Sequence, residues 1–271
     1  MTGRTGCAPA SRRPSAISRV SPAVIDLNAD LGEGAGTDDG LLQYMTSANV
    51  ACGVHAGDAE TIRRTVALAQ AHGVGIGAHP SFPDREGFGR RAMTLPADDV
   101  VATVADQIEV VARVARDAGA HLQHVKPHGA LYNQAATDHA LAAAIGNAVR
   151  RVDASLIVMA LAGSPMVTVL RDLGLRVARE AFVDRAYSSD GTLVPRNQRG
   201  ALVTDPAAAA RRAVRLATEH TVMAESGETI SVDADTLCLH GDTPGAVVLA
   251  RAVRGALDHA GVRVQRLDAF V

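Results

Sequence analysis

Cysteine and long apolar runs are both scarce in this sequence of 271 residues. The three cysteines, Cys7, Cys52 and Cys238, form an odd and sparse set, which argues against a disulfide framework and is typical of a reducing, cytoplasmic setting. Cys52 and Cys238 lie inside apolar segments, so we expect small buried hydrophobes there rather than nucleophiles. No apolar stretch approaches the roughly 20 residues that a membrane-spanning helix requires, and we expect no membrane partner.

A basic stripe and several common catalytic motifs are also missing. The formal net charge is −2 and no long Lys/Arg-rich segment occurs, so a nucleic acid is not expected as a partner. The glycine-rich segment DLGEGAG (30–36) could bring backbone N–H groups to an anion. No Lys-Ser/Thr pair follows it, which excludes a Walker loop. The sequence has no Gly-x-Ser-x-Gly elbow and no Cys-x-x-Cys pair.

The first 22 residues differ in composition from the rest of the chain. They are rich in Ser, Arg, Pro and Gly and show no apolar periodicity. They also lack the apolar segment of about 7–15 residues that a secretory signal contains. We predict a disordered N-terminal tail over 1–22 and a single catalytic domain over 23–271.

From residue 23 onward, short apolar segments alternate with longer segments of helical periodicity. The segments typical of buried strands are 24–28, 48–52, 74–78, 122–126, 155–160, 175–179 and 236–240. Helix starts are marked by a capping residue, alone or followed by proline at the first helical position. They are Asp58, Ser164-Pro165, Asp205-Pro206 and Thr243-Pro244. Segment 221–232 predicts a small hairpin, and 262–267 an eighth or accessory strand.

Strands separated by helices predict parallel pairing, because parallel strands need long crossover connections. Two architectures satisfy this pattern, a doubly wound open sheet and a closed (β/α) barrel. An open sheet gathers its ligands at one switch point, whereas a barrel assembles its site from the carboxyl ends of many strands. Polar residues follow nearly every predicted strand in this sequence, which favours the barrel.

Four histidines stand where an apolar segment ends and a loop containing glycine or proline begins. They are His55 in VACGVHAGD, His79 in GIGAHP, His128 in HVKPHGA and His240 in LCLHGD. The other strand ends contribute Asp26, Asn28, Asp30, Glu33, Asp58, Asp84, Lys126, Glu180, Asp184, Arg185 and Asp242. Ionisable groups that converge on one rim perturb one another's pKa values, as general acid–base chemistry requires. We expect Arg90 and Arg91 to be solvated.

Six motifs together resemble the LamB/YcsF family over essentially everything from residue 24 to the end. In order, they are IDLNADLGEG, ANVACGVHAGD, GIGAHPSFPDREGFGRR, VKPHGALYN, EAFVDRAYSSDGTLVPR and LCLHGDTPGA. The resemblance implies an irregular seven-stranded (β/α) TIM-like barrel of the glycoside hydrolase/deacetylase type. It also implies a 5-oxoprolinase activity, in which the B and C subunits act as partners in the cleavage of 5-oxo-L-proline to L-glutamate with hydrolysis of ATP. We expect ATP with Mg²⁺ as the cofactor, in a site that lies in, or is shared with, a partner subunit.

Roles for the rim residues are hypotheses built on acid–base chemistry. Asp30 or Glu180 is the expected base, and His128 or His240 the expected acid or oxyanion donor. Substrate binding is assigned to Asn28, His55, His79, Lys126, Asp184, Arg185 and Asp242.

Two alternatives stay open at this point. One is a metal-dependent amide or N-acetyl hydrolase that uses Asp30, His55 and His79 as ligands. Because the histidines lie on separate strands without a compact H-x-x-x-H spacing, we expect no tightly bound transition metal. The other alternative is a non-catalytic subunit that binds carbohydrate or a partner protein, which the density of ionisable residues disfavours.

Overall fold

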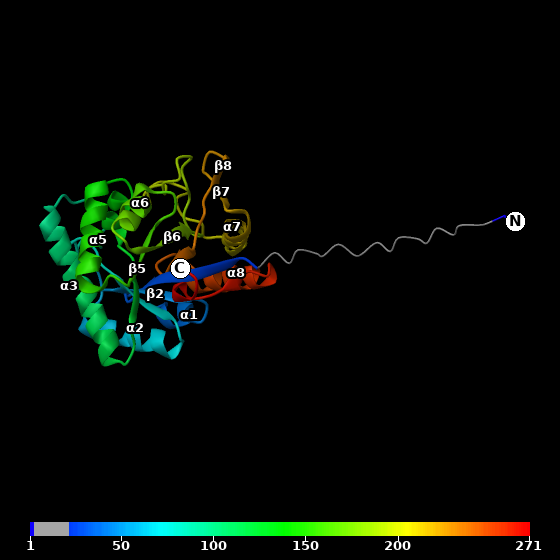
Figure 1. Cartoon of the computed structure of the whole chain (residues 1–271). Helices are drawn as coiled ribbons and strands as arrows, with labels where there is room; N and C mark the ends of the chain where they lie inside the picture. The colour runs from blue at the N-terminus through cyan, green and yellow to red at the C-terminus, as the bar shows by residue number, and fades with distance from the viewer. Residues whose placement is uncertain (3–21) are drawn as a thin grey trace.

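Seven parallel strands form a closed barrel at the centre of the molecule (Figure 1). The strands are β1 (Val24–Leu31), β2 (Ser47–Ala51), β3 (Gly75–His79), β4 (Leu122–Val125), β5 (Ile157–Leu161), β6 (Arg176–Phe182) and β9 (Thr236–His240). Strand β1 pairs with β2 on one side and with β9 on the other, and the second pairing closes the barrel. This closure confirms the predicted seven-stranded barrel and excludes the open doubly wound sheet.

The computed structural model describes residues 1–2 and 22–271. The predicted tail over 1–22 therefore lies almost entirely outside the described residues. Three further strands lie outside the closed ring of seven. Strand β10 (Arg263–Val264) pairs with β1 as the predicted accessory strand, and β7 (Thr221–Met223) and β8 (Thr229–Ser231) form the predicted antiparallel hairpin.

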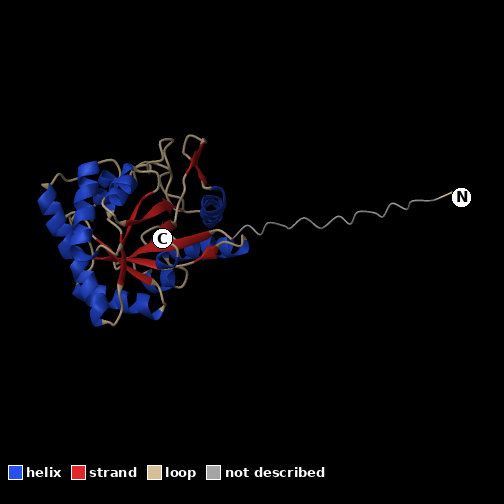
Figure 2. Cartoon of the chain, in the orientation of Figure 1, coloured by secondary structure: helices blue, strands red, loops and turns tan. Residues whose placement is uncertain are grey.

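Helices surround the strands (Figure 2). They are α1 (Asp38–Leu42), α2 (Ala59–Ala71), α3 (Ala97–Asp117), α4 (Gly129–Ala135), α5 (His139–Asp153), α6 (Pro165–Asp172), α7 (Pro206–Glu219), α8 (Ala246–His259) and the 3₁₀ helix η1 (Leu267–Ala269). The inner face of α3 has apolar residues at helical spacing, with Val104, Ile108 and Val111 buried against the barrel.

Most of the predicted helix starts are confirmed. The Asp58 carboxylate accepts from the Thr61 N–H at 2.8 Å, and Asp205 caps α7 in the same way. The prediction for Thr243-Pro244 is wrong, because α8 begins only at Ala246, after a left-handed turn at Gly245 (φ 74°). The Thr243 hydroxyl instead donates to the buried, ionised carboxylate of Asp184 at 2.8 Å, a charge-assisted hydrogen bond.

Side chains of β1 alternate between the hydrophobic core outside the barrel and the barrel interior. The outward set is Ile25, Leu27, Ala29 and Leu31. The inward set, Asp26, Asn28 and Asp30, is polar and buried. Room for such an interior comes partly from glycine, because a Cβ atom on Gly77 would lie 2.1 Å from Nε2 of the buried His124. The barrel is therefore filled by a polar column that leads up to the carboxyl ends of the strands.

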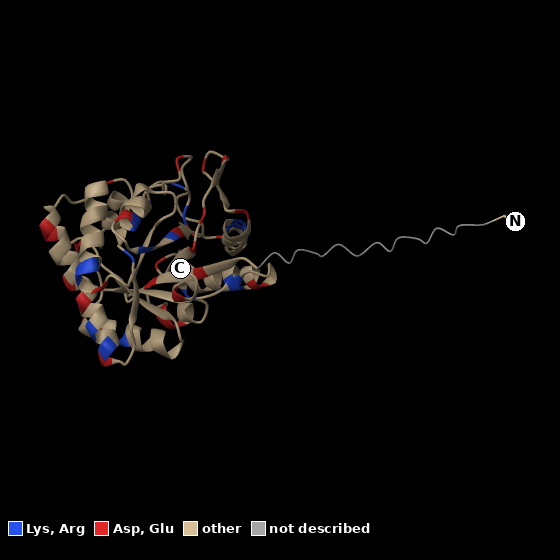
Figure 3. Ribbon diagram, viewed as in Figure 1, with Lys and Arg blue, Asp and Glu red and all other residues tan. Residues whose placement is uncertain are grey.

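Charged residues of both signs are interspersed over the outer helices (Figure 3), as expected for a formal net charge of −2. Among the helices that the structure describes, none has the length and apolar character needed to cross a membrane.

Candidate active site

A cavity of about 630 Å³ lies at the carboxyl ends of the barrel strands. Residues at or just beyond the ends of six strands line it: Asp30, His79, Lys126, Leu161, Phe182 and His240. The loops after β4 and β6 complete the wall, which also carries Tyr132 and three arginines, Arg90, Arg185 and Arg196. The cavity thus occupies the place where a (β/α) barrel gathers reactive side chains.

Lys126 forms the centre of the cavity floor. Its Nζ lies 2.9 Å from Asp30 Oδ1, 3.0 Å from Glu180 Oε1 and 3.0 Å from Cys238 Sγ. Burial alone would lower the pKa of Lys126, but the negative charges of Asp30 and Glu180 outweigh burial and hold this pKa well above its usual value. The floor therefore presents a fixed cation. Burial also raises the pKa of Cys238, which keeps its thiol protonated, in agreement with the sequence-based expectation.

Asp30 is oriented so that one carboxylate oxygen is occupied and the other is available. Oδ1 accepts from Asn49 Nδ2 and from Lys126 Nζ, both at 2.9 Å. Oδ2 faces two histidines, at 3.3 Å from His79 Nε2 and 3.9 Å from His240 Nε2. Burial opposes ionisation, but the positive charges of His79 and Lys126 outweigh it and hold the pKa of Asp30 well below its usual value. Asp30 is therefore an ionised, directed acceptor.

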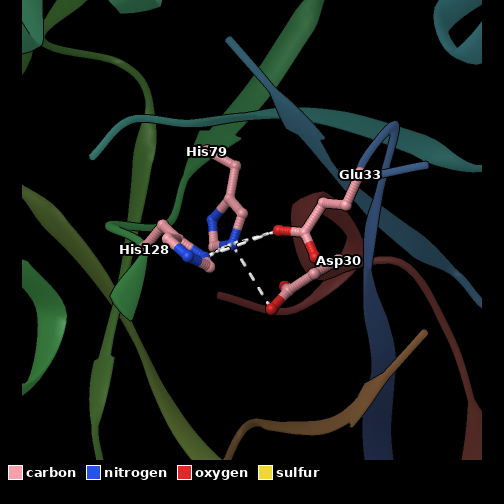
Figure 4. A group of neighbouring side chains, drawn as sticks. All are labelled: Asp30, Glu33, His79 and His128. Atoms are coloured by element: carbon pink, nitrogen blue, oxygen red, sulfur yellow. Dashed lines mark hydrogen bonds and ion pairs between the residues drawn. The ribbon is translucent and has the colours of Figure 1, made fainter. Parts of the chain in front are cut away.

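Backbone carbonyl groups fix the tautomers of two histidines in the cavity wall. Nδ1–H of His79 donates to the Lys126 carbonyl at 2.6 Å, and Nε2–H of His128 donates to the Phe88 carbonyl at 2.8 Å. Figure 4 shows the two rings beside Asp30 and Glu33. Burial, together with the charge of His79, holds the pKa of His128 well below its usual value, so this ring is neutral.

Behind these rings, His55 supports both His128 and Glu33. The ring of His55 stacks on that of His128 with centroids 3.9 Å apart, and its Nε2 lies 3.1 Å from Glu33 Oε1. His55 is not part of the cavity lining, although the sequence analysis assigned it to substrate binding. Its contacts make it a positioning residue.

On the opposite side, Asp184 and His240 form a second pair. Nδ1 of His240 lies 3.0 Å from Asp184 Oδ1, and the Thr243 hydroxyl donates to Oδ2 at 2.8 Å. Burial opposes ionisation of Asp184, but the charge and hydrogen bonds of His240 outweigh it and lower the pKa of Asp184 to about 2. In the neutral ring the ionised carboxylate keeps the proton on Nδ1, so that Nε2 faces the cavity as an acceptor.

Arginines give the cavity mouth a positive character. Arg90 and Arg196 both contact the carboxylate of Asp242, at 2.5 Å and 3.0 Å. Arg185 is 5% exposed, and its Nη2 donates to the Val194 carbonyl at 2.6 Å. Among the described residues its buried Nε has no hydrogen-bond partner. One guanidinium N–H is therefore free for a ligand.

Residues 25–271 match the LamB/YcsF family. The chain belongs to the LamB/YcsF family. It is 50% identical over 251 residues to the 5-oxoprolinase A subunit of Bordetella pertussis, a match that covers 91% of this chain and 99% of that protein. The protein of the same name from Streptomyces avermitilis is 54% identical over 246 residues, which are 89% of this chain and 98% of that protein.

A solved relative of this LamB/YcsF chain is the lactam utilization protein from Thermus thermophilus. The two share 47% sequence identity with a TM-score of 0.85, over 90% of this chain and 100% of that chain. The six motifs thus identified the family correctly, and the Thermus structure confirms the fold.

The residues predicted for the site of this LamB/YcsF protein fall into two layers. Asp30, His79, Lys126, His128, Arg185 and His240 line the cavity. Behind the cavity, in contact with its lining residues or with each other, lie Asn28, His55, Glu180 and Asp184. Asp242 lies at the exposed mouth, where it contacts Arg90. Glu180, predicted as a base, sits below Lys126, because β6 continues to Phe182 and Glu180 is level with the first residue of β9. In this position Glu180 holds Lys126 in place and does not reach the cavity.

Several residues of the cavity were not found from the sequence. Tyr132, Phe182 and Arg196 belong to quoted motifs, but nothing in their spacing distinguishes them from loop or core residues. Arg90 is exposed, as expected, and it also lines the cavity and pairs with Asp242 across the mouth. The expectation holds for Arg91, whose side chain is largely exposed. Pairing across the mouth joins segments far apart in sequence, so no local signal could reveal it.

Two groups of side chains among the described residues bring possible metal ligands together. One is Asp30, Glu33, His79 and His128, and the other is Asp30, Cys238 and His240. Neither group contains the predicted ligand His55, whose Nε2 is bound to Glu33. The second group includes the Cys238 sulfur that Lys126 already contacts, and the ammonium group would repel a cation there. Only the first group is suited to a metal ion.

Proposed function

We propose that this chain is the A subunit of a 5-oxoprolinase and that it opens the lactam ring of 5-oxo-L-proline to give L-glutamate. The names and identities of its relatives support the reaction, which it carries out with the B and C subunits and with ATP and Mg²⁺. The observation that carries the proposal is one cavity in which a buried lysine, an Asp–His pair and a free arginine N–H converge.

The substrate class follows from Arg185 and from the volume of the cavity. At neutral pH 5-oxoproline carries a carboxylate, and a bound carboxylate would satisfy the unpaired Nε–H of Arg185. Although burial lowers the pKa of Arg185 to about 10, the guanidinium remains charged at neutral pH. A cavity of about 630 Å³ is larger than the five-membered lactam alone, so it also has room for a phosphoryl group on the ring oxygen.

His240 is the proposed proton carrier. Its Nε2 accepts a proton from a water molecule that attacks the ring carbon, and it then returns the proton to the ring nitrogen as the C–N bond breaks. Asp184 stabilises the imidazolium that forms between these steps. Lys126 faces the ring oxygen and stabilises the negative charge of the phosphoryl group on it. Cleavage of the C–N bond leaves an acyl phosphate, which a second water molecule hydrolyses to L-glutamate and inorganic phosphate.

ATP is proposed to act outside this cavity or in a site shared with a partner. The lactam is an unstrained amide, and phosphorylation of its oxygen makes the ring carbon electrophilic enough for water to attack. The chain lacks a Walker loop, which supports a nucleotide site in, or shared with, one of the two partner subunits. This division of labour makes activity dependent on the assembled enzyme.

The test is ATP-dependent glutamate release by the chain purified alone and together with its candidate partners. We expect turnover only from the assembly, and His240→Gln and Asp184→Asn should each lower it at least about a hundredfold. The exposed pair His72 and Asp39, 3.4 Å apart, offers matched controls in His72→Gln and Asp39→Asn. No glutamate from the complete assembly would refute the proposed function. Normal turnover in the Asp184 and His240 variants would favour a non-catalytic, binding role for this chain.

A further inference from the structure

Two ring nitrogens face each other in the cavity wall. Because His79 and His128 each donate one ring N–H to a backbone carbonyl, the remaining nitrogens, His79 Nε2 and His128 Nδ1, are both acceptors unless His79 carries a second proton. These two atoms are 3.0 Å apart. Two buried acceptors at that distance repel each other unless a proton or a cation lies between them.

A single proton does not satisfy this group. The oxygen atoms Asp30 Oδ2 and Glu33 Oε1 lie 3.3 Å and 3.8 Å from His79 Nε2. A proton on His79 Nε2 makes one good hydrogen bond, either to Asp30 or to His128. The acceptor left out then lies buried against the others without a donor, which is unfavourable. A cation at the centre would contact all four atoms at once.

The distances fit the edges of a tetrahedral metal site. Zinc binds histidine nitrogen and carboxylate oxygen at about 2.0–2.2 Å, so neighbouring ligand atoms in a tetrahedron lie about 3.3–3.5 Å apart. The four edges measured here are 3.0, 3.3, 3.5 and 3.8 Å. The ligand atoms of the group all lie within 4.8 Å of one another. No large rearrangement is needed to enclose an ion.

The surroundings hold each ligand in the orientation that metal binding needs. Oδ1 of Asp30 is occupied by Asn49 and Lys126, which leaves Oδ2 for the ion. The carbonyl that holds His128 belongs to Phe88, whose φ of 57° is an uncommon, strained value for a non-glycine residue. Partners of this kind on metal-binding histidines and carboxylates typically strengthen metal affinity 10–100-fold.

We propose that Asp30, Glu33, His79 and His128 bind one divalent transition-metal ion at the wall of the cavity. Two imidazoles and two carboxylates suit Zn²⁺, Mn²⁺ or Co²⁺ better than Mg²⁺ or Ca²⁺, which prefer oxygen ligands. The sequence-based expectation of no tightly bound metal rested on the missing H-x-x-x-H spacing. The barrel provides the proximity instead, because His79 ends β3 and His128 follows the neighbouring β4. The proposal is independent of the proposed lactam chemistry.

The test measures metal on the isolated full chain, purified without a histidine tag and stripped with a chelator. We expect about one equivalent of Zn²⁺ to bind, and Co²⁺ to give the visible absorption of a tetrahedral site. His79→Gln and His128→Gln should abolish the absorption and weaken Zn²⁺ binding more than about 100-fold, beyond what loss of an outer partner causes. His55→Phe, which keeps a ring against His128 but frees Glu33, should weaken binding by about 10–100-fold. The exposed His72→Gln should leave it unchanged.

Urea denaturation of each variant, read by circular dichroism, shows whether it is folded. Folded His79→Gln and His128→Gln proteins that bind Zn²⁺ as tightly as the parent would overturn the proposal, because the ion would then be held elsewhere. Failure of the stripped parent chain to bind either metal would also overturn it. A metal-binding chain that releases no glutamate with its partners would refute the proposed function and leave the metal site standing.

Discussion

Asp26, at the bottom of the polar column inside the barrel, offers a pH-dependent test of how the interior is built. Three hydroxyl groups donate to its carboxylate, from Thr46 at 2.6 Å, Ser47 at 2.8 Å and Thr236 at 2.5 Å. The residue is fully buried, and burial outweighs these hydrogen bonds and raises the pKa of Asp26 from 3.8 to about 6. The variant to make is Asp26→Asn, which keeps the shape and removes the charge.

The sign of the effect follows from proton linkage. Asp26 binds its proton more tightly in the folded than in the unfolded protein, so its contribution favours folding at low pH. That advantage is lost as the pH rises from about 4 to about 6. A shift of about two pKa units corresponds to about 3 kcal/mol of unfolding free energy at pH 8. Asn avoids this penalty but loses about 1 kcal/mol, because its NH₂ would face the Thr236 hydroxyl, which already accepts from Asn28.

Asp26→Asn should therefore be about 2 kcal/mol more stable than the parent at pH 8, and slightly less stable at pH 4. The assay is urea unfolding of both proteins at several pH values, with the difference in unfolding free energy plotted against pH. Subtracting one unfolding free energy from the other cancels the contribution of every titrating group that the two proteins share. A difference that stays constant from pH 4 to pH 8 would refute the reasoning, because it would mean that folding does not change the pKa of Asp26.

Three further outcomes are expected. Lys126→Met should reduce the free energy of unfolding by about 3–5 kcal/mol in urea titrations, because two buried carboxylates lose their cation; unchanged stability would mean that they are already protonated. Gly77→Ala should cost about 1–3 kcal/mol by thermal unfolding, since its methyl group would displace His124, and an unaltered melting temperature would contradict this close approach. Arg185→Gln should raise the KM of the assembled enzyme for 5-oxoproline about tenfold or more with little change in kcat, as expected for lost ground-state binding. The exposed Arg91→Gln is its control, and an unaltered KM in Arg185→Gln would remove Arg185 from the carboxylate site.

The barrel could be predicted from this sequence because polar residues follow most of its strands. The depth at which each polar side chain lies within the barrel could not be predicted, since this depth depends on where each strand ends. The predicted segment 175–179 stops before Glu180, whereas β6 runs to Phe182, and this difference moves Glu180 from the rim to the layer below. In the same way β1 extends from the predicted 24–28 to Leu31, so that Asn28 lies inside the barrel. Periodicity alone does not show how far a strand continues past a polar residue.

Residue pairs that join distant segments also could not be predicted from the sequence. The Asp184–His240 contact links residues 56 positions apart, and Arg90 meets Asp242 over a separation of 152. The local sequence around these residues does not reveal their partners, because only the closed barrel decides which residue each one meets. The metal proposal has the same origin, because His79 and His128 come together through strand pairing.

Closure of the barrel by β1 and β9 has a consequence for synthesis of the protein. The first and last barrel strands meet through contacts such as Asn28 with Thr236, which are 208 residues apart in sequence. At about 5–20 residues per second, β1 emerges from the ribosome roughly 10–40 s before its partner. During that interval the inward-facing polar side chains of β1 lack the strand β9 that buries them. Asp30 and His240 come from these two strands, so the candidate site is completed only after β9 has been synthesised.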